Sequence, residues 1–265
     1  MPSAANNHEG VARIMRSEEM NFNIIHINEC DSTNAYLQRL VMEDESQEGT
    51  VISTSFQTKG RGQLTNVWEA EANRNILCSI LLRPTNLPIK SQFLISQAIS
   101  VAIVDVLNSY TDGFSIKWPN DIYYKEDKIA GILIENNLSS AGISTCIIGL
   151  GLNVNQKTFK SDAPNPISLF NIIGRETSVP ELLQSILDRF DKVYSLAYSN
   201  VELLRENYFN NLLFNGQVRE YADENGKFLG KIVDVENDGH IIIEDMEGNK
   251  RRYAFKGVTF LFPNS

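Results

Sequence analysis

The chain has 265 residues, which fits one large domain or a large domain with a small one, and 42% of them are hydrophobic, as in ordinary globular proteins. Its 24 basic and 33 acidic residues give a formal charge of −9, which argues against a nucleic-acid-binding protein, since such proteins display a basic face. The cysteines Cys30, Cys78 and Cys146 are far apart and the histidines are isolated. This pattern disfavours a disulfide framework, a structural zinc site and a Ser-His-Asp triad, and it suits reduced thiols in a cytoplasm.

No targeting or membrane segment is expected. The longest uncharged apolar-rich run, residues 91–104, contains polar side chains and is shorter than the about 20 residues that a transmembrane helix needs. The first residues lack an apolar stretch and include Glu9, Glu18 and Glu19, unlike a signal or transit peptide. We therefore expect a cytoplasmic protein with no membrane partner.

The N-terminal residues 1–21 are polar and aperiodic, which predicts a flexible tail. Apolar runs then predict strands over residues 22–27, 50–56, 75–82, 114–118, 121–124, 128–135 and 145–154. A helix is predicted from the capping residues at 31–34 to about residue 41. The dense apolar pattern of residues 91–110 predicts a helix packed on a sheet, and Pro180 opens a further long helical stretch.

From residue 215 the pattern of the sequence changes to short strand-like segments separated by turns. Short strand patterns alternate with the turn segments Glu224-Asn225-Gly226, Asp238-Gly239 and Glu247-Gly248-Asn249. These features predict a small β-barrel domain over residues 215–265, after a main domain over 22–214.

A glycine-rich loop follows the strand at 50–56. Gly60 and Gly62 free the backbone to wrap around an anion, and Lys59 and Arg61 add positive charge. The loop lacks the P-loop pattern, and Gly-Arg-Gly taken by itself favours a mobile surface loop.

The segment from Lys117 to Asp121 reads KWPND. After the bend at Pro119, Asn120 and Asp121 present an amide and a carboxylate at one spot, where they could orient a ribose, a phosphate or phosphate-bound Mg²⁺. An ordinary turn between two strands is the alternative, because Asn and Asp are common turn formers.

Lys128 begins an otherwise apolar strand that runs to Glu135. An ammonium group at the mouth of a core attracts an anion, although a lysine at a strand end often simply reaches water. Gly149 and Gly151 weaken the next strand unless something must approach its backbone closely. Asn153 follows them, and it either contacts a nucleotide or ends the strand; the lone GxG does not support a Rossmann fold.

In this order, the segments resemble those of biotin–protein ligases, the holocarboxylase synthetase class. The matching segments are Asp31-Ser32-Thr33-Asn34, Gln57 with Gly60-Arg61-Gly62, Lys117 to Asp121, Lys128 to Glu135, and Gly149 to Asn153. The resemblance covers roughly residues 22–262, and the KWPND and KIAGILIE segments are its specific parts. It implies an α+β fold, with a mixed β-sheet catalytic domain and packed helices similar to class II aminoacyl-tRNA synthetases, plus an SH3-like C-terminal β-barrel.

The resemblance implies a two-step reaction. Biotin and ATP, with Mg²⁺, form biotinyl-5′-AMP and pyrophosphate. A lysine of the biotin carboxyl carrier domain of a biotin-dependent carboxylase then attacks the mixed anhydride. Lys128 and Arg61 are the implied catalytic residues, because cations stabilise the negative charge that develops between the carboxylate and the α-phosphate.

The remaining site residues follow from the same resemblance. Biotin binding is implied for Ser32, Thr33, Asn34, Gln57, Gly60, Arg61, Gly62, Gln63, Lys128 and Gly131. ATP binding is implied for Arg61, Trp68, Lys117, Asn120, Asp121, Lys128 and Asn153, with Trp68 available to stack on adenine and Asp121 as the one candidate Mg²⁺ ligand.

Two departures from the family pattern are visible. Gln63 and Thr65 stand where the family loop usually has arginine and glycine, which predicts altered closure over the adenylate. About 21 residues precede the first predicted strand, too few for a helix-turn-helix domain. We therefore expect a ligase-only form that binds no nucleic acid, as a monomer or a homodimer.

Two rival functions remain to be weighed. A lipoate or octanoate ligase or transferase has the same fold, but its loop signature of paired arginines, three glycines and a His-Asp pair is absent from this sequence. A non-catalytic regulator that binds biotin or adenylate would not require both Lys128 and Arg61.

Overall fold

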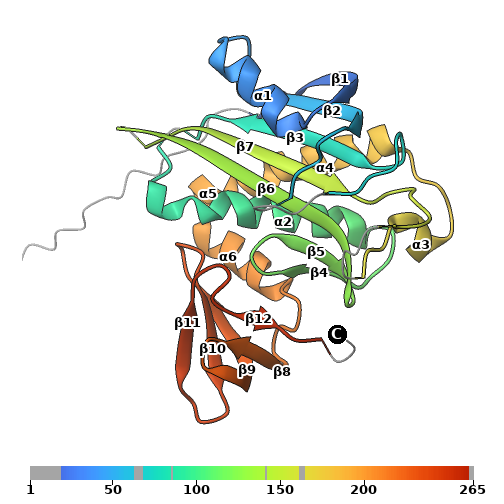
Figure 1. The fold of residues 1–265 in the computed structure, drawn as a ribbon. Helices are drawn as coiled ribbons and strands as arrows, with labels where there is room; N and C mark the ends of the chain where they lie inside the picture. Colours follow the sequence, from blue (N-terminus) through green and yellow to red (C-terminus); the bar gives the residue numbers. More distant parts are fainter. Residues whose placement is uncertain (1–18, 63–67, 85, 141, 161–164, 263–265) are drawn as a thin grey trace, which may run out of the picture.

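A seven-stranded mixed sheet forms the body of the computed structural model, and a five-stranded antiparallel sheet lies at its C-terminal end (Figure 1). The structure describes residues 19–62, 68–84, 86–140, 142–160 and 165–262. The predicted α+β fold with a small C-terminal β-domain is confirmed. The expected N-terminal tail falls mostly on residues 1–18, which lie outside the described residues, while the Met20 amide donates to Asp191 Oδ1 at 3.1 Å.

The strands of the large sheet are β1 (Asn23–Cys30), β2 (Thr50–Gln57), β3 (Ile76–Leu82), β4 (Phe114–Lys117), β5 (Asp121–Tyr124), β6 (Asp127–Ser139) and β7 (Gly142–Leu152). Their spatial order is β1-β2-β3-β7-β6-β5-β4. β1 pairs with β2 in parallel, and the other neighbours are antiparallel. β3 is buried at every position because it lies inside the sheet and is covered on both faces, as its unbroken apolar run predicts.

Helices cover both faces of this sheet (Figure 1). α1 (Thr33–Met42) contacts β2, β3 and β7 on one face, where Leu37 is fully buried in a small apolar cluster. α2 (Phe93–Asn108) packs on the other face, together with α4 (Val179–Tyr194). The remaining helical segments are η1 (Ile89–Ser91), α3 (Leu169–Ile173), α5 (Leu196–Ser199) and α6 (Val201–Asn210).

α2 explains the most apolar stretch of the chain. With η1 it forms a 20-residue helical segment, Ile89–Asn108, whose mean hydropathy of 1.3 would suit a membrane span by length and composition. Its most apolar window is 61% buried inside the protein, between the sheet, α4 and α6. The apolar pattern therefore marks a core helix, as its density predicts.

The C-terminal domain consists of β8 (Val218–Asp223), β9 (Gly226–Val235), β10 (Ile241–Asp245), β11 (Lys250–Tyr253) and β12 (Thr259–Phe260), in the order β11-β10-β9-β8-β12. Gly226, Gly239 and Gly248 adopt positive φ at its three predicted turns. This antiparallel sheet is consistent with an SH3-like domain.

The two parts of the molecule are joined through the KWPND segment. The indole Nε1 of Trp118 donates to the Gly239 carbonyl at 2.9 Å, and its ring lies edge-on to Phe255 with the centroids 6.1 Å apart. Tyr208 of α6 donates its hydroxyl to the Pro119 carbonyl at 2.7 Å. Part of this motif therefore holds the C-terminal domain against the large sheet.

Candidate active site

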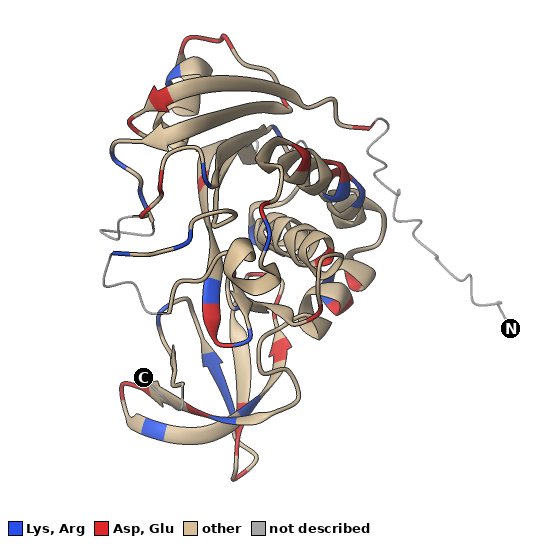
Figure 2. Cartoon of the chain, turned by 90° about the vertical axis from the view of Figure 1, so that its right-hand side faces the viewer, with Lys and Arg blue, Asp and Glu red and all other residues tan. Residues whose placement is uncertain are grey.

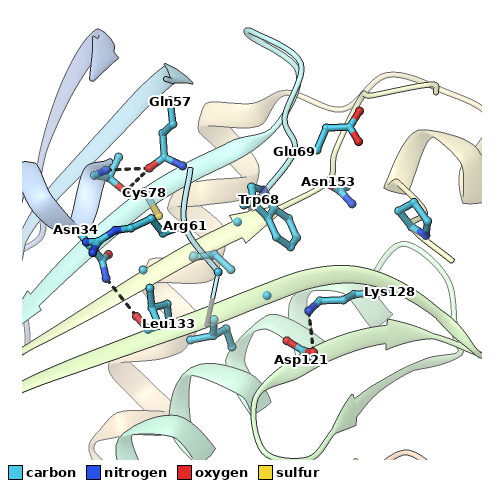
Figure 3. A pocket seen from close by; sticks show the side chains of 18 of the residues that line it. Asn34, Gln57, Arg61, Trp68, Glu69, Cys78, Asp121, Lys128, Leu133 and Asn153 are labelled. Atoms are coloured by element: carbon cyan, nitrogen blue, oxygen red, sulfur yellow. Dashed lines mark hydrogen bonds and ion pairs between the residues drawn. The ribbon is translucent and has the colours of Figure 1, made fainter. Parts of the chain in front are cut away.

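A cavity of about 580 Å³ opens on the face of the large sheet that carries the start of α1 (Figure 3). Its volume is in the range of sites for small-molecule ligands. The sequence-predicted residues that line it are Ser32, Thr33, Asn34, Gln57, Arg61, Gly62, Trp68, Lys117, Asp121, Lys128, Gly131 and Asn153. The fold therefore brings together side chains that are distant in the sequence.

Three predicted residues are not in this lining. Gln63 lies outside the described residues, as does Thr65. Gly60 accepts a hydrogen bond from the Trp68 amide at 3.1 Å, and a Cβ there would lie 2.7 Å from the Trp68 carbonyl oxygen. Asn120 is buried, and its Nδ2 donates to the Ile132 carbonyl at 2.8 Å, so it ties the KWPND turn to β6.

One end of the cavity is a network of hydrogen-bonded polar side chains at the start of α1. Gln57, the last residue of β2, accepts hydrogen bonds through Oε1 from the Thr33 amide at 2.8 Å and from the Thr33 hydroxyl at 3.2 Å. Ser32, one of the predicted capping residues, makes no side-chain capping bond. Gln57 instead supplies the acceptor for the Thr33 amide in the first turn of the helix. Asn34 donates through Nδ2 to Glu135 Oε2 at 2.7 Å.

Ser79 completes this network and is absent from the sequence prediction. It is fully buried on β3, and its hydroxyl lies 2.7 Å from Thr33 Oγ1 and 2.5 Å from Asn34 Oδ1. A serine within an apolar strand is a usable signal, because a buried hydroxyl needs a partner.

The glycines of β6 and β7 make room for side chains of the protein itself. Gly131 pairs with Gly151 across the two strands, and the Trp68 ring lies over both (Figure 3). A Cβ on Gly151 would lie 2.5 Å from Trp68 Cε2, and one on Gly131 3.0 Å from Cζ3. A Cβ on Gly149 would collide with the Asn34 amide. The expectation that something approaches this backbone closely is met by Trp68 and Asn34.

Cations surround the other end of the cavity. Lys128 Nζ lies 2.7 Å from Asp121 Oδ2 and 5.9 Å from the centre of the Trp68 ring. Burial lowers the pKa of Lys117; the Asp121 carboxylate opposes this effect and Lys128 adds to it. Arg61 Nη2 lies 3.9 Å from Glu135 Oε2. Glu135 Oε2 also accepts from Asn34 at 2.7 Å, so Arg61 lies beside the polar end (Figure 3), while Lys117 of β4 and Lys128 of β6 supply the charge at the other end.

The described lining offers no strong nucleophile. Burial raises the pKa of the Cys78 thiol to about 12, so Cys78 stays protonated near neutral pH and is unreactive. Burial, with Asp121 and Asp127, likewise raises the pKa of Tyr123. None of the described residues in the lining is a histidine. The arrangement is suited to positioning substrates and to stabilising negative charge that develops during a reaction.

Two buried polar atoms beside the cations have no hydrogen-bond partner among the described residues. They are Trp68 Nε1 and Asn153 Oδ1, while Asn153 Nδ2 donates to the Ile167 carbonyl at 3.1 Å. A ligand with its own donors and acceptors would satisfy both atoms.

A possible metal-binding group lies elsewhere, in the C-terminal domain. Glu236, Asp238 and His240 bring their ligand atoms within 4.8 Å of one another. Arg252 already contacts Glu236 Oε2 at 2.6 Å and Asp238 Oδ2 at 2.7 Å. This group is therefore an ion-pair network at the surface.

Comparison with known proteins gives a consistent result. Residues 27–153 match the model of the Biotin/lipoate A/B protein ligase family. The chain is 30% identical to the bifunctional ligase/repressor BirA of Bacillus spizizenii, over 91% of this chain and 75% of that protein. It is 24% identical to the biotin–[acetyl-CoA-carboxylase] ligase of Mycobacterium tuberculosis, over 80% of each.

A solved structure agrees with these relatives. Biotin protein ligase from Aquifex aeolicus, determined in complex with biotin and ATP, superimposes with a TM-score of 0.74 at 27% identity, over 90% of this chain and 99% of that one. Identity at this level across nearly the whole length, together with the cavity described above, assigns the family. The chain belongs to the biotin–protein ligases.

Proposed function

We propose that this enzyme attaches biotin to a lysine of a biotin carboxyl carrier domain, using ATP and passing through biotinyl-5′-AMP. One observation carries the proposal: a single cavity joins a polar network at one end, with Arg61 beside it, to Lys117 and Lys128 at the other. Biotin has a neutral, polar ureido ring and a carboxylate tail, and ATP brings the anionic phosphates. The two ends therefore match the two substrates in kind.

Biotin is assigned to the end formed by α1 and β2. Its ureido group needs both donors and acceptors, which the side chains of Thr33, Asn34 and Gln57 supply. Ser32, Gly62 and Gly131 line the same cavity, and Leu133 adds apolar surface. Gly60 and Gln63 complete the proposed loop, Gln63 lying outside the described residues.

ATP is assigned to the end formed by Trp68 and the lysines. The Trp68 face suits adenine stacking, and Lys117, Lys128 and Arg61 suit the phosphates. Asn153 offers its unpartnered Oδ1 to the nucleotide. We propose that Asn120 contributes to this end indirectly, because its hydrogen bond to the Ile132 carbonyl holds β6 in place where Ile132 lines the cavity. Mg²⁺ enters as MgATP, with Asp121 as the protein carboxylate nearest to serve it, because Mg²⁺ is typically held by phosphates and one or two carboxylates.

The chemistry follows from these assignments. A biotin carboxylate oxygen attacks the α-phosphorus, the bond to pyrophosphate breaks, and Lys128 and Arg61 stabilise the charge that develops. The amine of the carrier lysine then attacks the acyl carbon, loses its proton, and AMP departs. We propose that Arg61 helps to shield the anhydride from water.

We propose that the enzyme acts in the cytoplasm. Free, largely buried cysteines suit a cytoplasm. Basic and acidic side chains are intermingled over the coloured part of the chain (Figure 2), which does not favour nucleic acid as a partner. The carrier would belong to a biotin-dependent carboxylase, the enzyme acting as a monomer or a homodimer, with residues 22–214 as the ligase domain.

The proposal is tested by incubating the protein with biotin, MgATP and a purified carrier domain, and by detecting biotin on the carrier with a streptavidin blot. The carrier is expected to be labelled only when ATP is present. A matched reaction with lipoate and a lipoyl domain should give no product. Lipoylation without biotinylation would contradict the proposal.

Ser79→Ala is expected to weaken biotin binding about five- to tenfold and to leave the KM for ATP unchanged. The change removes the hydroxyl that contacts both Asn34 Oδ1 and Thr33 Oγ1, and one hydrogen bond contributes about 1 kcal/mol. Calorimetric titration with biotin measures the effect. Ser100→Ala is the matched control, since Ser100 on α2 is equally buried but its hydroxyl has no hydrogen-bond partner among the described residues. Equal biotin affinity in the two variants would rule out the role of Ser79.

A further inference from the structure

The ammonium group of Lys117 lies at the junction between the two parts of the molecule and faces three aromatic rings. Its Nζ is 5.3 Å from the ring centre of Tyr123, 5.8 Å from that of Phe260 and 5.8 Å from that of Phe262. Tyr123 belongs to β5 of the large sheet, whereas Phe260 lies on β12 and Phe262 follows it. We call these three residues the aromatic box.

Other aromatic side chains hold Phe260 and Phe262 in place. Phe262 stacks on Tyr123 with the ring centres 5.9 Å apart and the planes 5° apart, and it also packs against Phe214. Phe260 is paired with Tyr221 of β8 in the sheet and lies edge-on to its ring at 5.2 Å. Phe260 is therefore positioned by the core of the C-terminal domain, whereas Phe262 is positioned by its contacts with Tyr123 and Phe214.

Lys117 has no ion-pair partner among the described residues, and the nearby carboxylate of Asp121 is paired with Lys128 at 2.7 Å. Aromatic faces attract a cation without neutralising it. A lysine held by rings keeps its charge and its donors for an incoming anion, whereas a lysine paired with a carboxylate would first have to break that pair. Lys117 lines the cavity, while Phe260 and Phe262 lie behind it.

We propose that Phe260 and Phe262 of the C-terminal domain are positioning residues for ATP binding, which hold the Lys117 ammonium unpaired and directed at the cavity. This inference rests on the proposed function, and it gives the C-terminal domain a defined part in the first half-reaction. Phe262 acts through Lys117 and touches no substrate.

The experiment replaces Phe262 by pentafluorophenylalanine, which keeps the shape of the ring and removes the negative charge on its face. The KM for ATP in biotin-dependent pyrophosphate release is expected to rise about fivefold, the effect of one cation–π contact, with kcat and biotin affinity unchanged. The same replacement at Phe228 is the control. Its ring faces Arg251 at 4.2 Å in the same domain and does not line the cavity.

Two results would overturn the proposal: an active enzyme whose KM is unchanged by the fluorinated ring at 262, or an equal rise with the ring at 228. In a Lys117→Met background the fluorinated ring should have no further effect, whereas a purely structural role would produce the same loss in both backgrounds.

If the wild type releases no pyrophosphate, the proposed function fails. The aromatic box is then tested by NMR of the protein with ¹³C-dimethylated lysines. The Lys117 resonance is identified as the one missing from Lys117→Arg. The three rings should shift this resonance away from those of the other lysines, and in Phe262→Leu it should return toward them. No such shift would refute the box.

Discussion

Lys128→Ala is expected to lower the rate of biotin-dependent pyrophosphate release by at least about 100-fold, the usual cost of removing one group that stabilises a developing anion. Lys128 Nζ is the cation held between the Trp68 ring and Asp121 in the cavity, 5.9 Å from the ring centre and 2.7 Å from the carboxylate. Alanine removes this charge from the place where the proposed function brings together the carboxylate of biotin and the α-phosphate of ATP.

Stability is expected to change little, because both members of the Lys128–Asp121 pair are partly exposed and such pairs contribute about 1 kcal/mol or less. Thermal unfolding of the variant measures this separately from the rate. Lys157→Ala is the control, since Lys157 also faces an aromatic ring, at 4.6 Å from Phe170, without lining the cavity. A folded Lys128→Ala protein with the wild-type rate would eliminate Lys128 as a catalytic residue.

The cationic end of the site was predictable because its contacts are local in the sequence. The charged turn at 125–127 predicts a hairpin, and β5 and β6 form it. An antiparallel hairpin places its flanking residues side by side, so the contact between Asp121 and Lys128 follows from a short stretch of chain.

The polar end could not be predicted in the same way. Ser79, Thr33 and Asn34 meet only after β3 has taken its place in the sheet and α1 has packed across it. Sequence separations of 45 and 46 residues put these contacts beyond local patterns. Only the presence of a hydroxyl in an apolar strand marked Ser79 in advance.

The KWPND motif shows how a functional pattern can include structural residues. Trp118 docks on Gly239, and Asn120 holds the Ile132 carbonyl. Of the segment, Lys117 and Asp121 line the cavity. A motif identifies a region of chemistry, while burial and hydrogen bonding decide which of its members can reach a ligand.

β6 also extends further than its apolar pattern predicts, to Ser139. Asn136 and Asn137 pair with Cys146 and Thr145 of β7, although no residue of β6 after Ile132 is more than partly buried. Ladder hydrogen bonds between backbones do not require hydrophobic side chains, so the end of a strand in a protruding hairpin leaves no apolar signal.

Gly151→Ala is expected to raise the KM for ATP about tenfold or more by displacing Trp68. None of Gly131, Gly149 and Gly151 adopts positive φ, so alanine is conformationally allowed and its effect is steric. The new Cβ would lie 2.5 Å from Trp68 Cε2 and 2.6 Å from Nε1, and the indole must move off the strand. Loss of aromatic stacking on a base costs about 1–3 kcal/mol. Steady-state kinetics measures the KM, and tryptophan fluorescence reports the displaced indole.

The neighbouring glycines supply matched variants that separate the two ends of the site. Gly131→Ala places its Cβ 3.0 Å from Trp68 Cζ3, so a smaller increase in the KM for ATP is expected. Gly149→Ala collides with the Asn34 amide, and it should weaken biotin binding while sparing ATP. Parallel losses of biotin and ATP binding in Gly149→Ala and Gly151→Ala would indicate general damage to β7. If instead each glycine variant affects one substrate only, biotin must lie against Asn34, which covers Gly149, and the nucleotide against Trp68, which covers Gly151. These two glycines are two residues apart on β7.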